Sequence, residues 1–215
     1  MIGKLRENGQ LSSFKSNLKE VIKIPKIFFD LISPLYDFII RGDPTSNVID
    51  ALELTGKEKV LEIGTGTGRS ISPIINFVSS IWILDPSVPM LQQAKEKFPS
   101  AKSVLGYAEK LPFDALRFDR IIAIDSLHHW DNQLKGLKEI ARVLESKGGL
   151  SIIVEFDPSK PLGHYIKSME KFFMMGSKFF TPLELRKLHK KAGLHVIRQA
   201  YVEAGTYITI ARKEH

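Results

Sequence analysis

The chain contains no cysteine among its 215 residues. This absence excludes disulfide bonds, thiolate zinc sites, a cysteine nucleophile and any cysteine-ligated iron–sulfur cluster. Apolar runs are also short, because none reaches the ~18 residues of a membrane-spanning helix. The first ten residues are polar and lack the apolar segment of a secretory signal peptide. From these absences we expect a cytoplasmic location, and we assign no residue to a metal site.

The composition is that of a globular domain, with 43% hydrophobic and 26% charged residues. The net charge is +7, from 31 basic and 24 acidic residues. A basic surface can attract RNA, DNA or an anionic membrane. However, the lysines are scattered, and no arginine-rich block with interleaved aromatics occurs. The pattern favours a solvated basic surface, so a nucleic-acid partner is open but not favoured.

A short β-type run followed by three alternating glycines marks residues 59–70, Lys-Val-Leu-Glu-Ile-Gly-Thr-Gly-Thr-Gly-Arg-Ser. The apolar residues at its start predict a buried strand. Gly64, Gly66 and Gly68 then predict a turn in which the backbone can take positive φ and a ligand can approach the main chain closely. Beyond the turn, helical spacing of apolar residues predicts a helix, at Ile71, Ile74, Ile75 and Val78. Strand, turn and helix together are typical of the first half of a nucleotide-binding βαβ unit.

The third glycine decides between cofactor classes. Counted from Gly64, the dinucleotide fingerprint requires a small residue where this chain has Arg69, and its third glycine comes one residue earlier, at Gly68. Glu62, just before the turn, would repel a pyrophosphate but could hold an ammonium group. A nicotinamide-dependent oxidoreductase is the alternative, and it would require Gly or Ala at position 69.

Residues 62–68, Glu-Ile-Gly-Thr-Gly-Thr-Gly, resemble the first motif of class I S-adenosylmethionine-dependent methyltransferases, in which a strand ends in Glu/Asp-x-Gly-x-Gly-x-Gly. The resemblance is to the type 11 group and, within it, to the ubiquinone and menaquinone C-methyltransferases. It implies S-adenosylmethionine as cofactor and S-adenosylhomocysteine as product. It also implies that the cofactor lies against Glu62, Gly64, Thr65, Gly66 and Gly68.

A second carboxylate follows the next predicted strand. Residues 80–84 are apolar and end at Asp85, 17 residues beyond Gly68, close to the distance at which such folds place a carboxylate against the ribose hydroxyls. An ionised carboxylate can accept from both hydroxyls and would repel a 2′-phosphate. A helix-capping turn through Ser87 is the structural alternative. Pro86 follows directly, and the resemblance implies that Met90 packs on the adenine, although Met90 could equally belong to the core.

Residues 104–113, Val-Leu-Gly-Tyr-Ala-Glu-Lys-Leu-Pro-Phe, are similar to the family segment Gly-Asp-Ala-Glu-x-Leu-Pro-Phe. Tyr107 replaces the aspartate that would accept from the adenine amino group. The resemblance then leaves the backbone N–H of Ala108 for a ring nitrogen and Glu109 for the amino group.

Polar residues follow the predicted strand at 118–125, which ends in Asp125, another candidate cofactor ligand. Ligands of open α/β sheets bind beyond the carboxyl ends of the strands, where His128 and His129 fall. Both histidines suit general-base chemistry near neutral pH and are the candidate catalytic residues, although a structural imidazole lining the pocket is the alternative. Methyl transfer needs alignment of the two reactants, and a base only if the nucleophile arrives protonated.

The N-terminal segment is expected to be a helical cap. Residues 12–26 can form a basic amphipathic helix that packs over the sheet, with peripheral membrane contact as a further reading. Residues 27–42 form a second apolar segment broken at Pro34. Its Ser33, Tyr36 and Asp37 are similar to the N-terminal segment of quinone-ring C-methyltransferases, which implies that Tyr36 lies over the cofactor; a buried tyrosine with an ordinary hydrogen bond is the alternative.

The rest of the chain completes an α/β pattern. We expect a helix at 134–144, a strand at 150–156, a helix from Thr181-Pro182-Leu183-Glu184 to about Lys191, and strands at 195–203 and 206–213. The Met- and Phe-rich residues 157–180 are either core or a substrate lid. This pattern predicts a three-layer Rossmann-like sandwich with a mostly parallel seven-stranded sheet and an antiparallel C-terminal hairpin. Residues 1–44 would be the cap and 45–215 the cofactor-binding domain.

The predicted function is methyl transfer from S-adenosylmethionine to a small, hydrophobic acceptor by direct displacement, with a quinone-like ring or a lipid as the two candidate acceptors. An RNA methyltransferase and a non-catalytic S-adenosylmethionine-binding protein are the alternatives. The sequence leaves the acceptor, the alkylated atom and the oligomeric state open.

Overall fold

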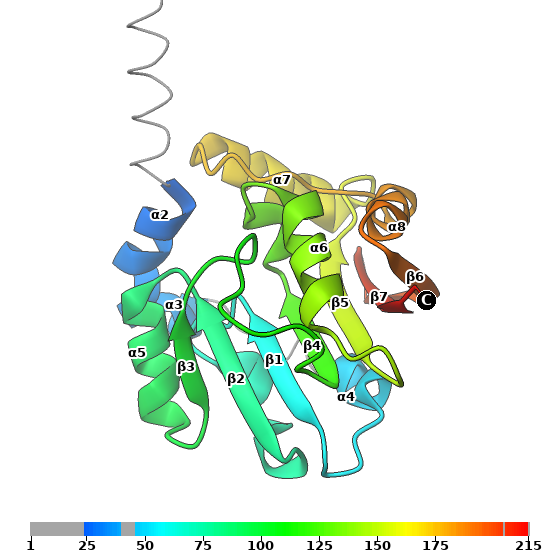
Figure 1. Cartoon of the computed structure of the whole chain (residues 1–215). Helices are drawn as coiled ribbons and strands as arrows, with labels where there is room; N and C mark the ends of the chain where they lie inside the picture. The colour runs from blue at the N-terminus through cyan, green and yellow to red at the C-terminus, as the bar shows by residue number, and fades with distance from the viewer. Residues whose placement is uncertain (1–23, 40–45, 204, 215) are drawn as a thin grey trace, which may run out of the picture.

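The computed structural model describes residues 24–39, 46–203 and 205–214. Its centre is a seven-stranded sheet in the order β3-β2-β1-β4-β5-β7-β6 (Figure 1). Strands β1 to β5 pair in parallel, and β7 pairs antiparallel with both β5 and β6. The strands are β1 (Lys59–Ile63), β2 (Ser80–Asp85), β3 (Lys102–Leu105), β4 (Arg120–Ile124), β5 (Leu150–Phe156), β6 (Leu194–Glu203) and β7 (Thr206–Lys213). The predicted fold class is confirmed.

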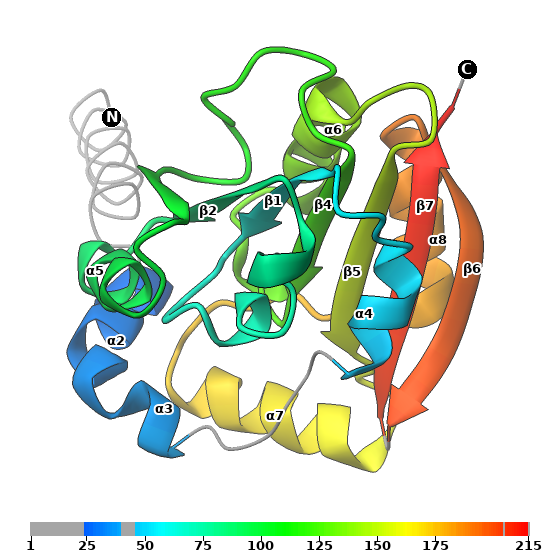
Figure 2. The ribbon, with the colours of Figure 1, turned by 90° about the horizontal axis from the view of Figure 1, so that it is seen from below.

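Helices form the outer layers of the sandwich on both faces of the sheet, and others lie along its carboxyl edge. The helices are α2 (Ile24–Ile32), α3 (Tyr36–Ile39), α4 (Ser46–Leu52), α5 (Val88–Lys97), α6 (Gln133–Val143), α7 (Pro161–Phe172) and α8 (Pro182–Lys191). One buried apolar cluster joins α4 and α5 to the sheet, and a second joins α6 and α8 to its other face. Figure 2 shows α4 in front of the sheet, with α6 and α8 behind it.

The prediction of a helix directly after the glycine turn is wrong. The chain instead makes two short 3₁₀ turns, at Arg69–Ile71 and Ile75–Phe77. Pro73 gives the physical reason, because its nitrogen carries no hydrogen and cannot continue an α-helical ladder. The apolar spacing still predicts burial correctly at Ile74, which is fully buried.

In the C-terminal third, the expected helix from Pro182 and the two expected last strands are confirmed, and helix α7 lies within residues 157–180. Helix α8 begins with a complete capping box, in which the Thr181 side chain accepts from the Glu184 N–H and the Glu184 carboxylate accepts from the Thr181 N–H. The expected terminal hairpin is β6 and β7. The Met- and Phe-rich region divides, because Met175 and Phe179 are buried whereas Phe172 and Met174 are exposed.

The described part of the expected cap lies at the carboxyl edge of the parallel strands. Helices α2 and α3 are separated by a 3₁₀ turn at Ser33–Leu35, where Pro34 was expected to break the segment. Figure 2 shows α2, α3 and α7 along the edge to which β5 points. Residues 12–23 of the predicted amphipathic helix lie outside the described residues, and the division at 44/45 stays a prediction. No helix in the described ranges has the length and apolarity needed to cross a bilayer.

Candidate active site

The three glycines of the turn after β1 all adopt positive φ, at +76° for Gly64, +54° for Gly66 and +82° for Gly68. A Cβ on Gly64 would lie 2.5 Å from the Cβ of Ser126, so Gly64 is required for packing against the end of β4. A Cβ on Gly66 would meet nothing within 4 Å. The middle of the loop therefore borders open space, as a backbone that receives a ligand must.

Glu62 lies beneath this loop and is fully buried. Its two carboxylate oxygens accept from the hydroxyls of Thr65, at 2.6 Å, and of Ser70. Burial raises the pKa of Glu62 to about 7, and the neighbouring Asp85 adds to this effect, although the two hydroxyl donors oppose it. Glu62 thus fixes both ends of the loop and places a buried acid behind it.

Asp85 ends β2 on the other side of the loop. One carboxylate oxygen accepts from the Gly66 N–H at 2.9 Å and the other from the Ser87 N–H at 2.8 Å. Burial raises the pKa of Asp85 to about 6, while these two N–H groups act in the opposite direction. The cap of α5 is Ser87, whose hydroxyl accepts from the Met90 N–H. Asp85 itself keeps a lone pair on each oxygen for two further donors.

Asp125 follows β4 in a left-handed conformation, with φ +49°. Its Oδ1 is buried and has no hydrogen-bond partner among the described residues. Burial raises the pKa of Asp125 to about 7, and the charge of Glu155 raises it further. The next residue, Ser126, donates to the Ile63 carbonyl at 2.9 Å, which places Asp125 beside the glycine loop. An unsatisfied buried acceptor here is suited to a donor on a ligand.

The predicted adenine ligands occupy different environments. Met90 and Ala108 are buried, and Ala108 belongs to one of the two core clusters. Glu109 accepts from the Asn132 N–H at 3.0 Å, and Tyr107 is 39% exposed. Pro86 is half-buried. The side chain of Tyr36 lies outside the described residues, so its expected position over the cofactor stays a prediction.

Two aspartates of the N-terminal helices contact the glycine loop and the turn after β2. Asp37 accepts from the hydroxyl of Thr67, in the glycine loop, and pairs with Lys97 of α5. Asp30 accepts from the hydroxyl of Ser87. No role could be predicted for these carboxylates, because each partner is 30 or more residues away and no local motif links the two residues.

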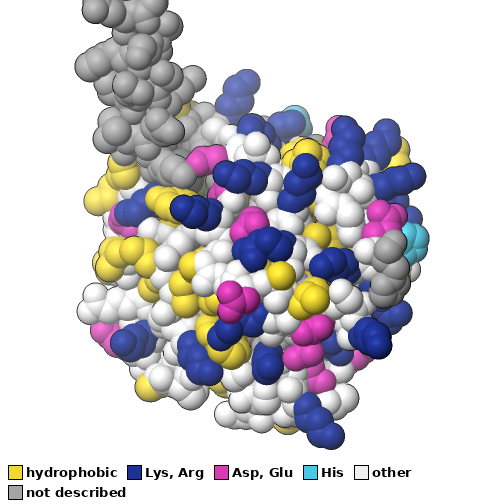
Figure 3. All heavy atoms as spheres, in the orientation of Figure 1, with side chains coloured by type: hydrophobic (Ala, Val, Ile, Leu, Met, Phe, Trp, Pro, Cys, Tyr) yellow, Lys and Arg dark blue, Asp and Glu magenta, His cyan; other side chains and the backbone are white. Residues whose placement is uncertain are grey.

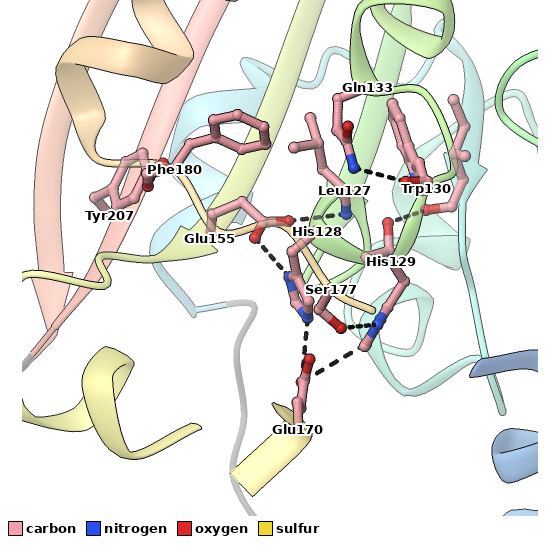
Figure 4. Close-up of polar contacts among 12 residues, drawn as sticks. Leu127, His128, His129, Trp130, Gln133, Glu155, Glu170, Ser177, Phe180 and Tyr207 are labelled. Atoms are coloured by element: carbon pink, nitrogen blue, oxygen red, sulfur yellow. Dashed lines mark hydrogen bonds and ion pairs between the residues drawn. The ribbon is translucent and has the colours of Figure 1, made fainter. Parts of the chain in front are cut away.

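His128 lies in a 3₁₀ turn, Leu127–His129, and is held between two buried carboxylates (Figure 4). Its Nδ1 is 2.6 Å from Glu155 Oε2, and both side chains are 2% exposed. Glu155 also accepts from the Leu127 N–H at 2.8 Å. Burial alone would lower the pKa of His128, but Glu155 and Glu170 outweigh it and raise the pKa to about 10. Without another cation, His128 is therefore an imidazolium at neutral pH.

His129 has the opposite electrostatics. Burial and the neighbouring charge of His128 hold its pKa well below the ordinary value. Its Nδ1 lies 3.1 Å from the Ser177 hydroxyl, and its Nε2 lies 3.8 Å from Glu170 Oε1. Aromatic rings border the pair, since Phe29 of α2 meets His129 edge-on at 5.1 Å and Phe179 stacks on His128 at 4.5 Å.

Sequence reasoning missed both carboxylates that face the histidines. Glu155 carried a signal, because it is the one acid in the apolar strand 150–156, and a buried carboxylate needs a partner. Glu170 carried none, since Met-Glu-Lys in an amphipathic helix is typical of a solvated face. Strand β5 and helix α7 bring these carboxylates to the edge of the sheet where Asp85 and Asp125 also lie.

The fold and this edge define a class of protein, the α/β proteins that bind a nucleoside at the carboxyl ends of parallel strands. Residues 61–152 match the family model described as "Methyltransferase domain". A solved SAM-dependent methyltransferase of Thermotoga maritima superposes with a TM-score of 0.65 at 26% identity, covering 77% of this chain and 87% of that one.

Two curated relatives carry the comparison further. The chain is 29% identical over 207 residues to 2-methyl-6-phytyl-1,4-hydroquinone methyltransferase 2 of Oryza sativa subsp. japonica, covering 87% of this chain and 59% of the relative. It is 30% identical over 162 residues to the demethylmenaquinone methyltransferase of Chlorobaculum tepidum, covering 67% and 66%. The chain thus spans less than two thirds of either relative. The matched domain and these relatives are methyltransferases, and the resemblance to the class I S-adenosylmethionine-dependent methyltransferases implies S-adenosylmethionine as the cofactor.

Proposed function

We propose that this protein transfers a methyl group from S-adenosylmethionine to a small, largely apolar acceptor that carries a hydroxylated aromatic ring, as a hydroquinone does. The observation that carries the proposal is the meeting, at one sheet edge, of the glycine loop and Asp85 with a histidine pair bordered by aromatic rings. The printed names of the two relatives, a hydroquinone methyltransferase and a demethylmenaquinone methyltransferase, support this class of acceptor.

The residues of the cofactor side fit S-adenosylmethionine. The open space over Gly66 admits a ligand against the main chain, and Asp85 can accept from both ribose hydroxyls. The unpartnered Oδ1 of Asp125 suits an ammonium group, and the buried acid of Glu62 behind the loop favours a positive charge in front of it. When bound, this cofactor supplies an electrophilic methyl group on a sulfonium leaving group.

The residues of the acceptor side fit an aromatic ring. Phe29 and Phe179 offer ring faces and edges next to the two imidazoles, and Phe28 packs on Phe173 at 5.6 Å. The histidine pair gives this apolar wall a polar point at which an acceptor hydroxyl can bind. Holding the two reactants in line can supply roughly 7–11 kcal/mol of the barrier reduction.

The surface supports a small acceptor over RNA. On the face drawn in Figure 3, lysines and arginines are interspersed with aspartates and glutamates and do not gather into one basic patch. Binding of RNA relies on clustered cations that contact phosphates. In contrast, α7 and the residues after it expose large apolar side chains, with Phe172 79% and Met174 73% exposed. Such side chains suit an acceptor that arrives from an apolar environment.

Transfer of labelled methyl groups tests the proposal. The full chain would be incubated with methyl-labelled S-adenosylmethionine and, in parallel, with a prenylated hydroquinone, methylhydroquinone, and a tRNA and rRNA mixture. We expect label in the hydroquinones, more in the prenylated one, and much less label after Asp85→Asn at a limiting cofactor concentration. Label in RNA alone would replace the proposal with an RNA methyltransferase. Cofactor binding without any labelled product would leave a non-catalytic binding protein. The cytoplasmic location stays a prediction.

A further inference from the structure

We propose that the Nε2 atoms of His128 and His129 and the carboxylate of Glu170 bind one divalent transition-metal ion at the acceptor side of the site. In Figure 4 the carboxylate of Glu170, from α7, lies below the two imidazoles, which belong to the turn after β4. The three side chains thus converge from two elements that the sequence separates by about forty residues. Among the residues that the structure describes, no other three side chains with metal-binding atoms converge in this way.

The distances are close to those of a formed site. The three ligand atoms all lie within 4.8 Å of one another. Glu170 Oε1 is 3.5 Å from His128 Nε2 and 3.8 Å from His129 Nε2. A tetrahedral ion with bonds of about 2.0–2.1 Å keeps its ligand atoms roughly 3.4 Å apart. Side-chain shifts of a few tenths of an ångström would therefore bring Glu170 into bonding range of an ion shared with either histidine.

Both histidines are oriented as metal ligands are. His128 contacts Glu155 through Nδ1, at 2.6 Å, and His129 contacts Ser177 through Nδ1, at 3.1 Å. These contacts fix each ring and leave Nε2 directed toward Glu170, which is the arrangement that outer partners give to histidines bound to metals.

Glu170 supplies an independent observation. Its Oε2 is buried and has no hydrogen-bond partner in the described part of the chain. A buried carboxylate oxygen without a partner is costly, and native structures rarely keep one without a function. A cation beside Oε1 would satisfy this oxygen through bidentate binding.

The donor set indicates the type of ion. Two imidazole nitrogens and one carboxylate suit Zn²⁺, Fe²⁺, Co²⁺ or Mn²⁺, whereas Mg²⁺ and Ca²⁺ prefer oxygen ligands alone. Three protein ligands leave at least one coordination position open, as in catalytic metal sites. The acceptor's hydroxyl oxygen can occupy that position, and this last assignment rests on the proposed function. No metal site could be predicted from the sequence, because no motif connects the histidine pair with Glu170.

Cobalt and zinc titrations test the site directly. The full chain, freed of metal with a chelator, would be titrated with Co²⁺ and followed by its visible absorption, then with Zn²⁺ as competitor. We expect one Co²⁺ per chain with the intense bands of four- or five-coordinate nitrogen and oxygen ligation, displaced by one equivalent of Zn²⁺. Glu170→Gln and His129→Gln should each weaken Zn²⁺ binding about 100-fold or more. His164→Gln is the matched control, since His164 is an exposed histidine on the same helix.

Each result decides the proposal. Circular dichroism and S-adenosylmethionine binding would show that the variants fold. The cobalt spectrum of the wild-type protein tests the site even if a variant does not fold. A featureless octahedral spectrum, or a loss of binding in His164→Gln but not in Glu170→Gln, would overturn the site and indicate surface histidines only. The metal readout needs no methyl transfer, so labelled product without metal binding would overturn this site alone. Metal binding without labelled product would overturn the proposed function alone.

Discussion

The two ends of the sheet treat buried charge in opposite ways. At the amino end, the Glu58 carboxylate accepts from the hydroxyl and N–H of Thr55 and from the N–H groups of Gly56 and Lys57. Burial would raise its pKa, but these donors bring it down to about 2. Arg120, at the start of β4, donates to the carbonyls of Leu52, Glu53, Asp119 and Gly148. Charge at this end is satisfied within the protein.

At the carboxyl end, buried acids have fewer donors than they can use. Burial raises the pKa of Glu62 and of Asp125 to about 7 and that of Asp85 to about 6. Asp125 and Glu170 each keep a buried oxygen without a partner in the described residues. The same sheet therefore has one end where buried charge is satisfied by the protein and one where buried oxygens are left for the proposed ligands.

The largest effect on stability should come from a substitution at the amino end of the sheet, where buried charge is fully hydrogen-bonded. Arg120→Met removes a buried guanidinium and leaves several carbonyl oxygens without donors, so we expect a loss of about 3 kcal/mol or more in the free energy of unfolding. Urea titration measures this loss, with Lys59→Met, an exposed lysine at the same end, as the control. Affinity for S-adenosylmethionine of the folded fraction should stay unchanged. An unaltered free energy of unfolding would show that the two ends do not differ as described.

A substitution at the carboxyl end should change the affinity for S-adenosylmethionine and leave the stability nearly unchanged. Asp85→Asn removes the charge that would accept from the ribose hydroxyls, and we expect about 100-fold weaker binding of S-adenosylmethionine, because charge-assisted hydrogen bonds contribute about 1.5–3 kcal/mol. Stability of the ligand-free protein should change by less than about 1 kcal/mol. Calorimetry gives the affinity and urea titration the stability. If stability fell while affinity held, Asp85 would be a structural residue.

The pH dependence of stability should differ in sign between the ends. Glu58 has its pKa lowered from 4.5 to about 2, so the stability that it contributes is present above pH 4.5 and is lost as the pH falls through 2. Asp85 has its pKa raised from 3.8 to about 6, so its contribution is present below pH 3.8 and is lost as the pH rises through 6.

Unfolding free energies of the ligand-free protein between pH 2 and 8 measure both contributions. Glu58→Gln should flatten the acid side of the curve, and Asp85→Asn the side between pH 4 and 6. If neither variant altered the pH dependence of the unfolding free energy in its own pH range, the electrostatic contrast between the two ends would be wrong.

The smallest effect is a matched pair of glycine substitutions. Gly66, with φ +54°, and Gly148, with φ +77°, both have open space where a Cβ would lie. Alanine at either position should cost roughly 1–2 kcal/mol of stability, because a left-handed backbone disfavours a Cβ. Only Gly66→Ala should also weaken S-adenosylmethionine binding, by about tenfold, because its methyl group would point into the ligand space. Equal affinities in the two variants would contradict the placement of the cofactor over Gly66.

The meeting of the glycine loop, Asp85 and Asp125 at one sheet edge could be predicted because each lies at the carboxyl end of a parallel strand, whereas their roles toward the cofactor stay predictions. Asp85 could be placed from spacing alone, and the glycine loop from its alternation. The helix after the loop failed at Pro73, where a missing N–H overrides apolar spacing. The acceptor side resisted prediction because its partners meet only in three dimensions. His128 was visible as a candidate, but its charge depends on Glu155 and Glu170, which neither spacing nor composition connects to it.

The stretch that matches the family model stops at residue 152, three positions before Glu155 and well before Glu170. It also begins after Asp37, which contacts the glycine loop, and after Asp30, which contacts the turn beyond β2. Two proteins could therefore be the same throughout the matched stretch and still present different acids to the histidine pair. Similarity in that stretch alone therefore compares the glycine loop and the strands around it, and it omits the acids that face the histidine pair.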